Sequence, residues 1–243
     1  MQKKILGPEL TLYRFQEHFE LNILALKSGN RVLLIDSGLS PHGQAVATDL
    51  KEQGMEVEVI INSHFHPDHI NGNKFFPGAH VWGSCFHATA KHRNPPPNQL
   101  LSDGEVLTFN HFQLRFIEAA GHCRHQLVTV IDGQFAFLGD LLMTAYDGVP
   151  WLPYIAPDGS IEQYLHDLDI VENLQVPTLI PAHGILITPE LKKTLIDTYR
   201  FYLLKLKELG PHCSIEDCIT EPDKIIHKWH QRNLSNIFRM TGK

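Results

Sequence analysis

The chain has 243 residues, enough for one large domain or two small ones with a sizeable buried core. Hydrophobic residues make up 43% and charged residues 20%, values typical of a soluble enzyme, which argues against disorder over most of the length. The formal net charge of −6 disfavours nucleic acid as a partner, because affinity for a polyanion comes mainly from basic side chains that contact phosphates.

The first third of the chain predicts four strands, at residues 10–15, 21–27, 32–35 and 57–61. A Gly/Asn turn joins the second and third of them into a hairpin. Between the third and fourth strands, Pro41 opens a helix that is expected to end at about Gln53, because Gly54 follows.

The middle of the chain predicts a short strand near residues 79–82, a helix near 84–92 and a loop at the prolines 95–97. A second β-rich stretch follows, with strands predicted at residues 106–109, 112–118, 127–131 and 135–138. The last part predicts a helix at 161–174, a strand at 178–180, a long helix from 189 to about 209 and a helical tail at 214–240 with a break at Pro222.

Strands thus gather in two blocks, each followed by helices. Two packed sheets flanked by helices are the natural layer arrangement for that order. No low-complexity linker separates the halves, so we expect a single domain over residues 1–243, with residues 189–243 as its C-terminal helical part.

Compartment and membrane contacts are read from the cysteines and the apolar runs. The four cysteines form no CxxC pair and show no spacing typical of a zinc knuckle or a disulfide framework, so reduced thiols are expected. The basic start lacks an apolar run long enough for a signal peptide, and no stretch reaches the roughly 18 apolar residues of a membrane span. We therefore expect a cytoplasmic protein without a membrane partner.

Histidine is the one unusual residue type, with 16 in 243 residues. The run His-Phe-His-Pro-Asp-His at residues 64–69 directly follows a predicted strand and brings three imidazoles and one carboxylate together. On an extended segment His64, His66 and Asp68 would share a face, while a turn would direct His69 toward a neighbouring point. Nitrogen ligands with a carboxylate suit zinc, iron or manganese better than calcium or magnesium.

Three later strands also end in a potential metal ligand. The strand at 112–118 leads to His122, the strand at 135–138 leads to Asp140, and the strand at 178–180 leads to His183. The C-terminal ends of strands are where α/β proteins usually assemble their sites. The four segments together therefore predict one metal site.

With these motifs in this order, the sequence resembles the metallo-β-lactamase-fold superfamily. Its ligand motifs are matched by residues 64–69, Gly121-His122, Gly139-Asp140 and Ala182-His183-Gly184, and its early structural motif by residues 34–38. The resemblance covers about residues 20–185. It implies an α/β fold, an αββα four-layer sandwich of two mixed β-sheets flanked by helices.

The resemblance also implies a dinuclear metal site. It assigns His64, His66 and His122 to one metal, and Asp68, His69 and His183 to the other. Asp140 would bridge the two metals. The expected cofactors are two Zn²⁺ ions, with iron or manganese as alternatives.

The implied activity is that of a binuclear zinc-dependent hydrolase acting on a small molecule. Two divalent ions about 3.5–4 Å apart would ionise a bridging water and polarise a carbonyl. Asp68, the expected catalytic residue, would hold a metal and orient the hydroxide. An ester, thioester, lactone or lactam could then be cleaved without a serine nucleophile, and the chain has no Gly-x-Ser-x-Gly elbow.

The residues that would contact a substrate are less clearly marked. Many lactonase and glyoxalase II members have a Thr-Pro-Gly-His run after the third ligand, whereas this chain has Cys-Arg-His-Gln at residues 123–126. Arg124 and His125 would meet an anionic substrate group or lie in a surface loop. Tyr146 and Trp151, in an aromatic loop beyond Asp140, would line the pocket, with Tyr146 as an oxyanion donor, or simply pack.

Two further residues have competing interpretations. Asp36 ends an apolar strand and either accepts a hydrogen bond from a ligand histidine or caps a turn or helix. Cys123 stands beside a ligand and is expected to be a small buried thiol. No ligand pattern surrounds the other histidines considered, which are His87, His92, His166, His212, His227 and His230.

Two alternatives to the hydrolase remain open. The first is a mononuclear iron oxidoreductase similar to the persulfide dioxygenases of the same superfamily. The second is a binding module with structural metals, although structural zinc sites are normally closed and often rich in thiolates. The oligomeric state is also open, with a homodimer as one alternative.

Overall fold

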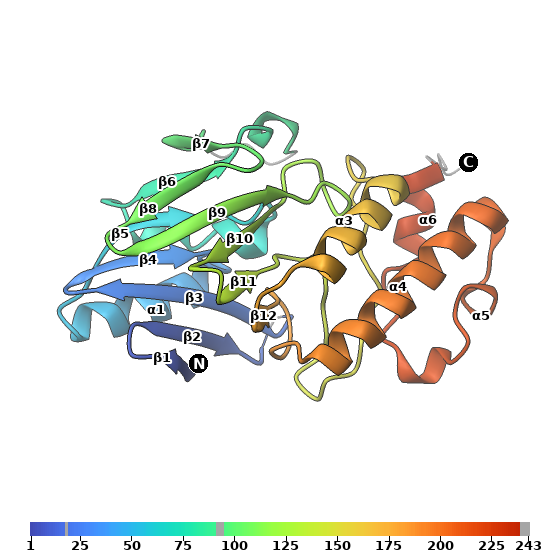
Figure 1. Cartoon of the computed structure of the whole chain (residues 1–243), viewed down its shortest axis with the longest axis horizontal. Helices are drawn as coiled ribbons and strands as arrows, with labels where there is room; N and C mark the ends of the chain where they lie inside the picture. The colour runs from blue at the N-terminus through green and yellow to red at the C-terminus, as the bar shows by residue number, and fades with distance from the viewer. Residues whose placement is uncertain (18, 91–94, 239–243) are drawn as a thin grey trace.

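The computed structural model describes residues 1–17, 19–90 and 95–238. The strands form two mixed sheets with helices on their outer faces, in the four layers expected (Figure 1). The first sheet has the sequential order β1 (Gln2–Gly7), β2 (Leu10–Phe15), β3 (Leu21–Ser28), β4 (Arg31–Ile35), β5 (Glu56–Ile61), β6 (His80–Ser84) and β7 (Gln99–Leu101). The second has the order β12 (Thr178–Ile180), β11 (Phe135–Phe137), β10 (Leu127–Ile131), β9 (Phe112–Glu118) and β8 (Val106–Phe109).

Both sheets combine antiparallel and parallel pairs. Strands β1 to β4 pair antiparallel, and β4 to β7 pair parallel. In the second sheet β8 to β11 are antiparallel, and β12 joins β11 in parallel. The parallel strands β4 and β5, and likewise β11 and β12, therefore bring their C-terminal ends to the same edge of their sheet.

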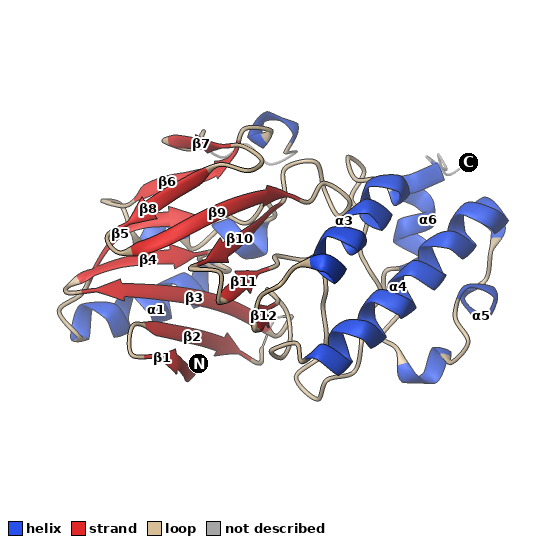
Figure 2. Ribbon diagram, viewed as in Figure 1, coloured by secondary structure: helices blue, strands red, loops and turns tan. Residues whose placement is uncertain are grey.

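The helices lie outside this pair of sheets (Figure 2). The longer ones are α1 (Ser40–Glu52), α3 (Ile161–Asn173), α4 (Pro189–Leu209) and α6 (His230–Phe238). One-turn elements are α2 (Pro67–Ile70), α5 (Ile215–Cys218), η1 (Asn73–Phe75), η2 (His87–Thr89), η3 (Gly210–His212) and η4 (Pro222–Lys224). None of these helices is apolar over enough of its length to span a bilayer.

Three apolar clusters hold the layers together. Between the sheets, leucines such as Leu24 and Leu33 of the first sheet pack with Phe116 and Phe137 of the second. Helix α1 covers the outer face of the first sheet through Val46 and Leu50. Helices α3 and α4 cover the second sheet through a cluster that contains Val128, Val130, Leu168 and Tyr199.

Strand β10 shows how the residue pattern produces these layers. Every residue of β10 is buried, because Leu127 and Ile131 face the other sheet while Val128 and Val130 face the helices. Alternate side chains of a strand point to opposite faces, so a strand covered on both sides reads as a continuous apolar run.

Two predicted helices were wrong in extent. At residues 84–92 the chain instead continues β6 to Ser84, which pairs with Leu101 of β7, and forms only the single turn η2; residues 91 and 92 lie outside the described part. In the tail, Ile226 is extended and bridges Trp151, so α6 begins only at His230. In both places pairing with a distant segment replaces the local helical pattern; residues 239–240 lie outside the described part. Strands β1 and β7 were not predicted.

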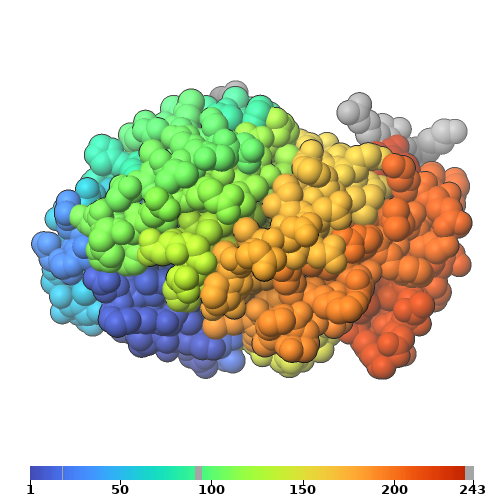
Figure 3. Space-filling view, in the orientation of Figure 1, coloured from blue at the N-terminus to red at the C-terminus, as the bar shows by residue number. Residues whose placement is uncertain are grey.

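The C-terminal helices lie directly against the sheet region. In the space-filling view the orange segment adjoins the yellow and green ones, and the red segment lies at the far end beside the orange one (Figure 3). The division into one domain with a helical part from residue 189 stays a prediction.

Candidate metal centre

The seven residues expected to bind metal come together beyond the C-terminal ends of four strands. Strand β5 leads to His64 and His66 and then to α2, which carries Asp68 and His69. Strands β9, β11 and β12 lead to the remaining three, His122, Asp140 and His183. The loop after β5 is therefore the main source, and the second sheet supplies one residue from each of three strands.

Three imidazoles form a first cluster. The His66 Nδ1 atom lies 3.0 Å from His64 Nε2 and 3.1 Å from His122 Nε2. Asp140 Oδ2 lies 3.8 Å from His64 Nε2 and 3.7 Å from His122 Nε2. These four residues can supply three nitrogens and one oxygen to a single ion.

A second cluster forms around the other oxygen of the same carboxylate. Asp140 Oδ1 lies 3.3 Å from both His69 Nε2 and His183 Nε2. The carboxylate of Asp68 lies 3.7 Å from each of these two nitrogens. Asp140 therefore stands between the clusters, with one oxygen toward each.

The one-turn helix α2 decides how the histidine run is divided. Pro67 occupies its first turn, which its fixed φ favours, so Asp68 and His69 leave the extended path of His64 and His66. The expectation that Asp68 shares a face with His64 and His66 on an extended segment was therefore wrong. Asp68 instead groups with His69 and His183.

The far nitrogen of four imidazoles is occupied by an acceptor. Nδ1 of His122 donates to the Tyr154 carbonyl at 2.8 Å, and Nδ1 of His183 donates to the Phe19 carbonyl at 2.6 Å. His69 Nδ1 donates to the Asp36 carboxylate at 2.8 Å. Because a neutral imidazole has one proton, Nε2 in each ring presents a lone pair to the centre.

Asp36 holds the fourth imidazole through a serine. Ser63 Oγ donates to Asp36 Oδ2 at 2.8 Å and so accepts from His64 Nδ1 at 3.1 Å. Asp36 Oδ1 also accepts from the Ser63 amide at 2.8 Å, and its carboxylate is fully buried. Of the two interpretations of Asp36, the structure supports the acceptor for a ligand histidine.

Two polar atoms at the centre have no hydrogen-bond partner in the part of the chain that the structure describes. Among the described residues, His69 Nε2 and Asp140 Oδ1 are buried without a hydrogen bond. Burial lowers the pKa of His66 to about 2 and that of His64 and His122 below its ordinary value, so the first cluster is neutral. Unprotonated nitrogens and orphaned buried atoms around one carboxylate fit metal cations.

The second cluster attracts positive charge. Although burial opposes the charged form, the Asp140 and Asp68 carboxylates raise the pKa of both His69 and His183 above its ordinary value. The same imidazoles hold the pKa of Asp140 well below its usual range. A cation at this position would take the place of a proton on the two rings.

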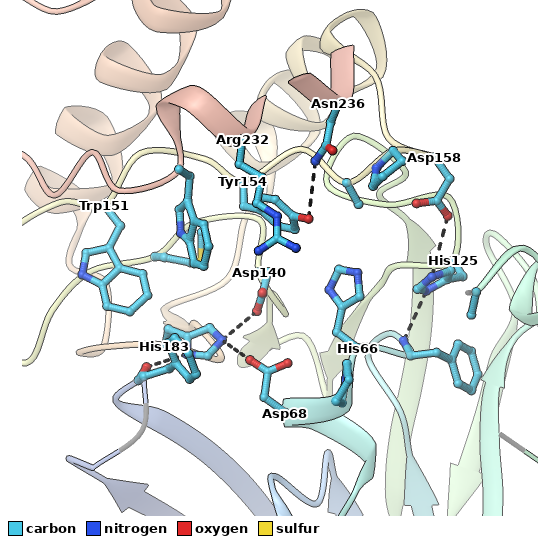
Figure 4. A pocket seen from close by; sticks show the side chains of 18 of the residues that line it. His66, Asp68, His125, Asp140, Trp151, Tyr154, Asp158, His183, Arg232 and Asn236 are labelled. Atoms are coloured by element: carbon cyan, nitrogen blue, oxygen red, sulfur yellow. Dashed lines mark hydrogen bonds and ion pairs between the residues drawn. The ribbon is translucent and has the colours of Figure 1, made fainter. Parts of the chain in front are cut away.

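A cavity of about 480 Å³ opens onto both clusters (Figure 4). Asp68, Asp140 and His183 are exposed to it, and His66 lines it from the opposite side. Its apolar wall is built from Phe19, Phe65, Met143, Trp151, Tyr154 and Trp229. The cavity therefore combines an apolar wall with the polar floor of the metal centre, as small-molecule sites usually do.

The four predicted substrate residues separate into two pairs. His125 and Trp151 line the cavity. Tyr146 and Arg124 are not among its described lining residues. The Tyr146 hydroxyl donates to the Leu21 carbonyl at 3.2 Å, and the Arg124 guanidinium stacks 3.4 Å above the centroid of the Phe86 ring.

Several lining residues were not anticipated. Tyr154 belongs to the aromatic stretch after Asp140, which the sequence predicted to lie at the pocket, although Tyr154 itself was not singled out. Arg232 and Asn236 come from α6, far along the chain from the last metal motif, and no sequence pattern marked them. Cys123 is buried, as expected, and burial raises the pKa of its thiol.

Comparison with known proteins is consistent with this geometry. The family model described as metallo-beta-lactamase superfamily matches residues 20–183. A hydroxyacylglutathione hydrolase from Prochlorococcus marinus is 26% identical over 155 residues, which cover 61% of this chain and 58% of that protein. The enzyme of the same name from Tolumonas auensis is 27% identical over 168 residues, covering 66% and 60%. The chain thus spans about three fifths of the length of these relatives.

Solved structures share the fold at low sequence identity. A metallo-beta-lactamase from Pontibacter korlensis superposes with a TM-score of 0.69 at 15% identity, covering 81% of this chain and 98% of that one. A metallo-beta-lactamase family protein from Thermus thermophilus gives a TM-score of 0.67 at 22% identity, with 84% and 83% covered.

Proposed function

The chain belongs to the metallo-beta-lactamase superfamily, and on that premise we propose that it is a metal-dependent hydrolase with two metal ions. The observation that carries the proposal is the pair of clusters on either side of Asp140, each with two or three imidazole nitrogens turned to one point. His64, His66 and His122 would hold one ion, and Asp68, His69 and His183 the other, with Asp140 shared.

Bound divalent ions would supply a water of lowered pKa and polarise a carbonyl. Residues of the chain would hold the ions and orient the water for that chemistry. Asp68 lines the cavity and lies within 3.7 Å of both imidazoles of the second cluster, so its carboxylate can hold the ion and orient a water. The apolar wall beside it excludes bulk water and strengthens electrostatic contacts within the site.

We propose a thioester as the preferred bond. The hydroxyacylglutathione hydrolases that the chain resembles carry the name of a thioester substrate, and the cavity is large enough for a small acyl group. Esters, lactones and lactams are the other members of the class. Zinc is the proposed metal, since the donors are imidazoles and carboxylates.

Each cluster has enough donor residues to hold an ion of its own. Two such clusters favour a hydrolase with two metal ions over a mononuclear iron oxidoreductase. The proposal further includes a small-molecule substrate and a cytoplasmic location. The location is supported by the four cysteines, which are all free thiols.

The direct test replaces a residue of the first cluster or the shared carboxylate. We expect His66→Ala and Asp140→Ala to lose bound metal and at least a hundredfold in the rate of thioester hydrolysis, because each removes a donor that the remaining ligands cannot replace. The exposed His111→Gln serves as the control. Metal content and turnover are measured on the same samples, alongside oxygen consumption with a persulfide. Full hydrolysis in either variant, or persulfide-dependent oxygen uptake, would contradict the proposal.

A further inference from the structure

A buried histidine beside the first cluster has one ring nitrogen already committed. His125 follows the ligand His122 by three residues and is only 2% exposed. Its Nδ1 atom accepts a hydrogen bond from the Phe65 amide at 3.2 Å and lies 3.4 Å from the Cys123 thiol. Phe65 is the residue between the ligands His64 and His66, so this contact ties two ligand segments together.

These contacts determine which nitrogen carries the proton. A backbone amide can only donate, so His125 Nδ1 must be the unprotonated acceptor. The proton of the ring is therefore on Nε2. That atom lies 3.7 Å from Asp158 Oδ2, and both residues line the cavity, as Figure 4 shows.

The separation of the two groups leaves room for a third atom. At 3.7 Å, His125 Nε2 and Asp158 Oδ2 are too far apart for a good hydrogen bond to each other. A single oxygen can nevertheless lie within about 2.7–3.0 Å of both atoms. Among the residues that the structure describes, the Thr89 hydroxyl also donates to this carboxylate oxygen, at 3.4 Å.

We propose that His125 and Asp158 form a substrate subsite for a hydroxyl group on the acyl chain, which accepts a hydrogen bond from Nε2–H and donates one to the carboxylate. The inference rests on the proposed hydrolase function and makes the two residues determinants of specificity. A water is the alternative occupant, and substrates without the hydroxyl would leave it in place.

The subsite lies at the right range for a hydroxyl close to the reacting carbonyl. The ring centroids of His125 and His66, which belongs to the first cluster, lie 5.8 Å apart, and both rings line the cavity. A substituent on the carbon next to a carbonyl reaches a position of that kind, whereas a distant part of the leaving group does not. The 2-hydroxyacyl thioesters are therefore the substrates that the pair would select.

The first measurement tests the tautomer without any turnover. In ¹⁵N-histidine-labelled, zinc-loaded protein, a long-range ¹H–¹⁵N correlation spectrum is expected to show His125 protonated on Nε2 alone, with the resonance assigned by its loss in His125→Phe. Adding lactate is expected to shift the Nε2 resonance, and adding propionate is not. An Nδ1-protonated ring, or equal shifts with both acids, would overturn the subsite.

The second measurement is kinetic and uses two matched probes, the lactoyl and propionyl thioesters of N-acetylcysteamine, which differ by one hydroxyl. We expect the wild type to prefer the lactoyl thioester in kcat/KM by at least about tenfold, roughly the value of one well-placed hydrogen bond. Asp158→Ala is expected to bring the ratio of the two kcat/KM values close to one. His125→Phe is expected to do the same with a lower rate on both thioesters, because it also removes the acceptor of the Phe65 amide.

The controls separate a lost subsite from a damaged protein. Asp158→Asn keeps an oxygen acceptor and should retain part of the preference, and the exposed Asp169→Ala on α3 should retain all of it. A preference that persists in Asp158→Ala would overturn the inference. If the wild type cleaves neither thioester the proposed function fails, and the resonance shifts with lactate and propionate still decide whether the subsite exists.

Discussion

At the scale of single residues, the site depends on where each imidazole places its second nitrogen. Four of the five histidines of the two clusters present Nε2 to the centre because an acceptor holds Nδ1, and His66 alone presents Nδ1. Asp36 is the acceptor with the widest reach. It holds His69 directly and His64 through Ser63, and so orients one histidine in each cluster.

We therefore expect Asp36→Asn to weaken metal binding by about 10–100-fold, because an amide donor facing His69 Nδ1 would disturb the tautomer of that ring. Affinity is measured by competition with a chromogenic chelator. Asp132→Asn is the matched control: Asp36 and Asp132 both have positive φ, 62° and 51°, and both accept from a backbone amide, but Asp132 lies in the turn between β10 and β11. Equal affinity in the two variants would contradict the role of Asp36.

At the scale of elements, helix α3 presses directly on the segment that carries His122. A Cβ atom on Gly121 would lie 2.2 Å from the Cα atom of Tyr164 in α3, a separation that no side chain can occupy without backbone movement. Asp167 of the same helix accepts from the Gly121 amide at 2.7 Å. The helix thus sets the position of His122, a member of the first cluster, by contact and by hydrogen bonding.

Gly121→Ala is expected to lower the free energy of unfolding by about 1–3 kcal/mol or more, since two backbone segments must separate to admit the methyl group. Metal content should fall with it, because His122 moves. In Gly78→Ala nothing lies within 4 Å of the added Cβ, so its unfolding free energy should change by less than about 0.5 kcal/mol. Urea denaturation measures both variants, and equal stabilities would show that the contact is not tight.

Asp167 predicts a dependence of stability on pH. Burial raises its pKa to about 6 from the ordinary 3.8, so between these two pH values the native state holds a proton that the unfolded chain has lost. This contribution to stability is complete below about pH 4 and disappears as the pH rises through 6, by roughly 3 kcal/mol in total.

In Asp167→Asn the amide mimics the protonated carboxyl, so wild type should lose stability relative to this variant between pH 4 and pH 7. Denaturation of both proteins across that range measures the difference between their free energies of unfolding. The other titrating groups are the same in both proteins, so their contributions cancel in this difference. Asp169→Asn, on the same helix but exposed, should track the wild type. Parallel curves for wild type and Asp167→Asn would show that Asp167 is charged throughout.

At the scale of the whole molecule, the C-terminal helix α6 completes the wall of the cavity by lying against the loop around Tyr154. The amide of Asn233 in α6 donates to the Pro153 carbonyl at 2.7 Å, and its oxygen accepts from the Ile155 amide at 2.9 Å. This attachment holds α6 beside the loop of Tyr154, so that Arg232 and Asn236 reach the cavity (Figure 4). The metal centre thus connects both sheets, and the cavity adds the last helix.

Removing the metal should therefore destabilise the whole fold. Without cations, buried polar atoms beyond the strand ends such as His69 Nε2 and Asp140 Oδ1 are left without a partner among the described residues, whereas a ligand present at a thousand times its Kd adds about 4 kcal/mol to the stability. Thermal unfolding in a chelator should occur well below the midpoint with zinc. In His66→Ala the two unfolding midpoints, in chelator and with zinc, should differ much less. If the chelator lowers the midpoint of this variant as much as that of the wild type, the metal is bound elsewhere.

The sequence by itself was sufficient for features that depend on local periodicity and short motifs. Strands β8, β9, β10 and β12 and helix α4 were predicted at their observed bounds, because each is one regular pattern that ends at a turn or proline. All seven expected metal ligands were found as strand-end motifs, and the structure brings them together. Their assignment to two metals remains a prediction.

Tertiary structure alone decided the features that depend on pairing between distant segments. The segment from Ser84 and the segment around Ile226 both have a local helical pattern. Ser84 and Cys85 are nevertheless bound to β7, and Ile226 to Trp151, since backbone hydrogen bonds to another segment outweigh a weak helical preference. Contacts between residues far apart in the chain likewise determine the orientation of Asp36, the tautomer of His125 and the position of Arg232 at the cavity. A one-dimensional pattern carries no record of which distant donor meets which acceptor, and only the packed layers determine that.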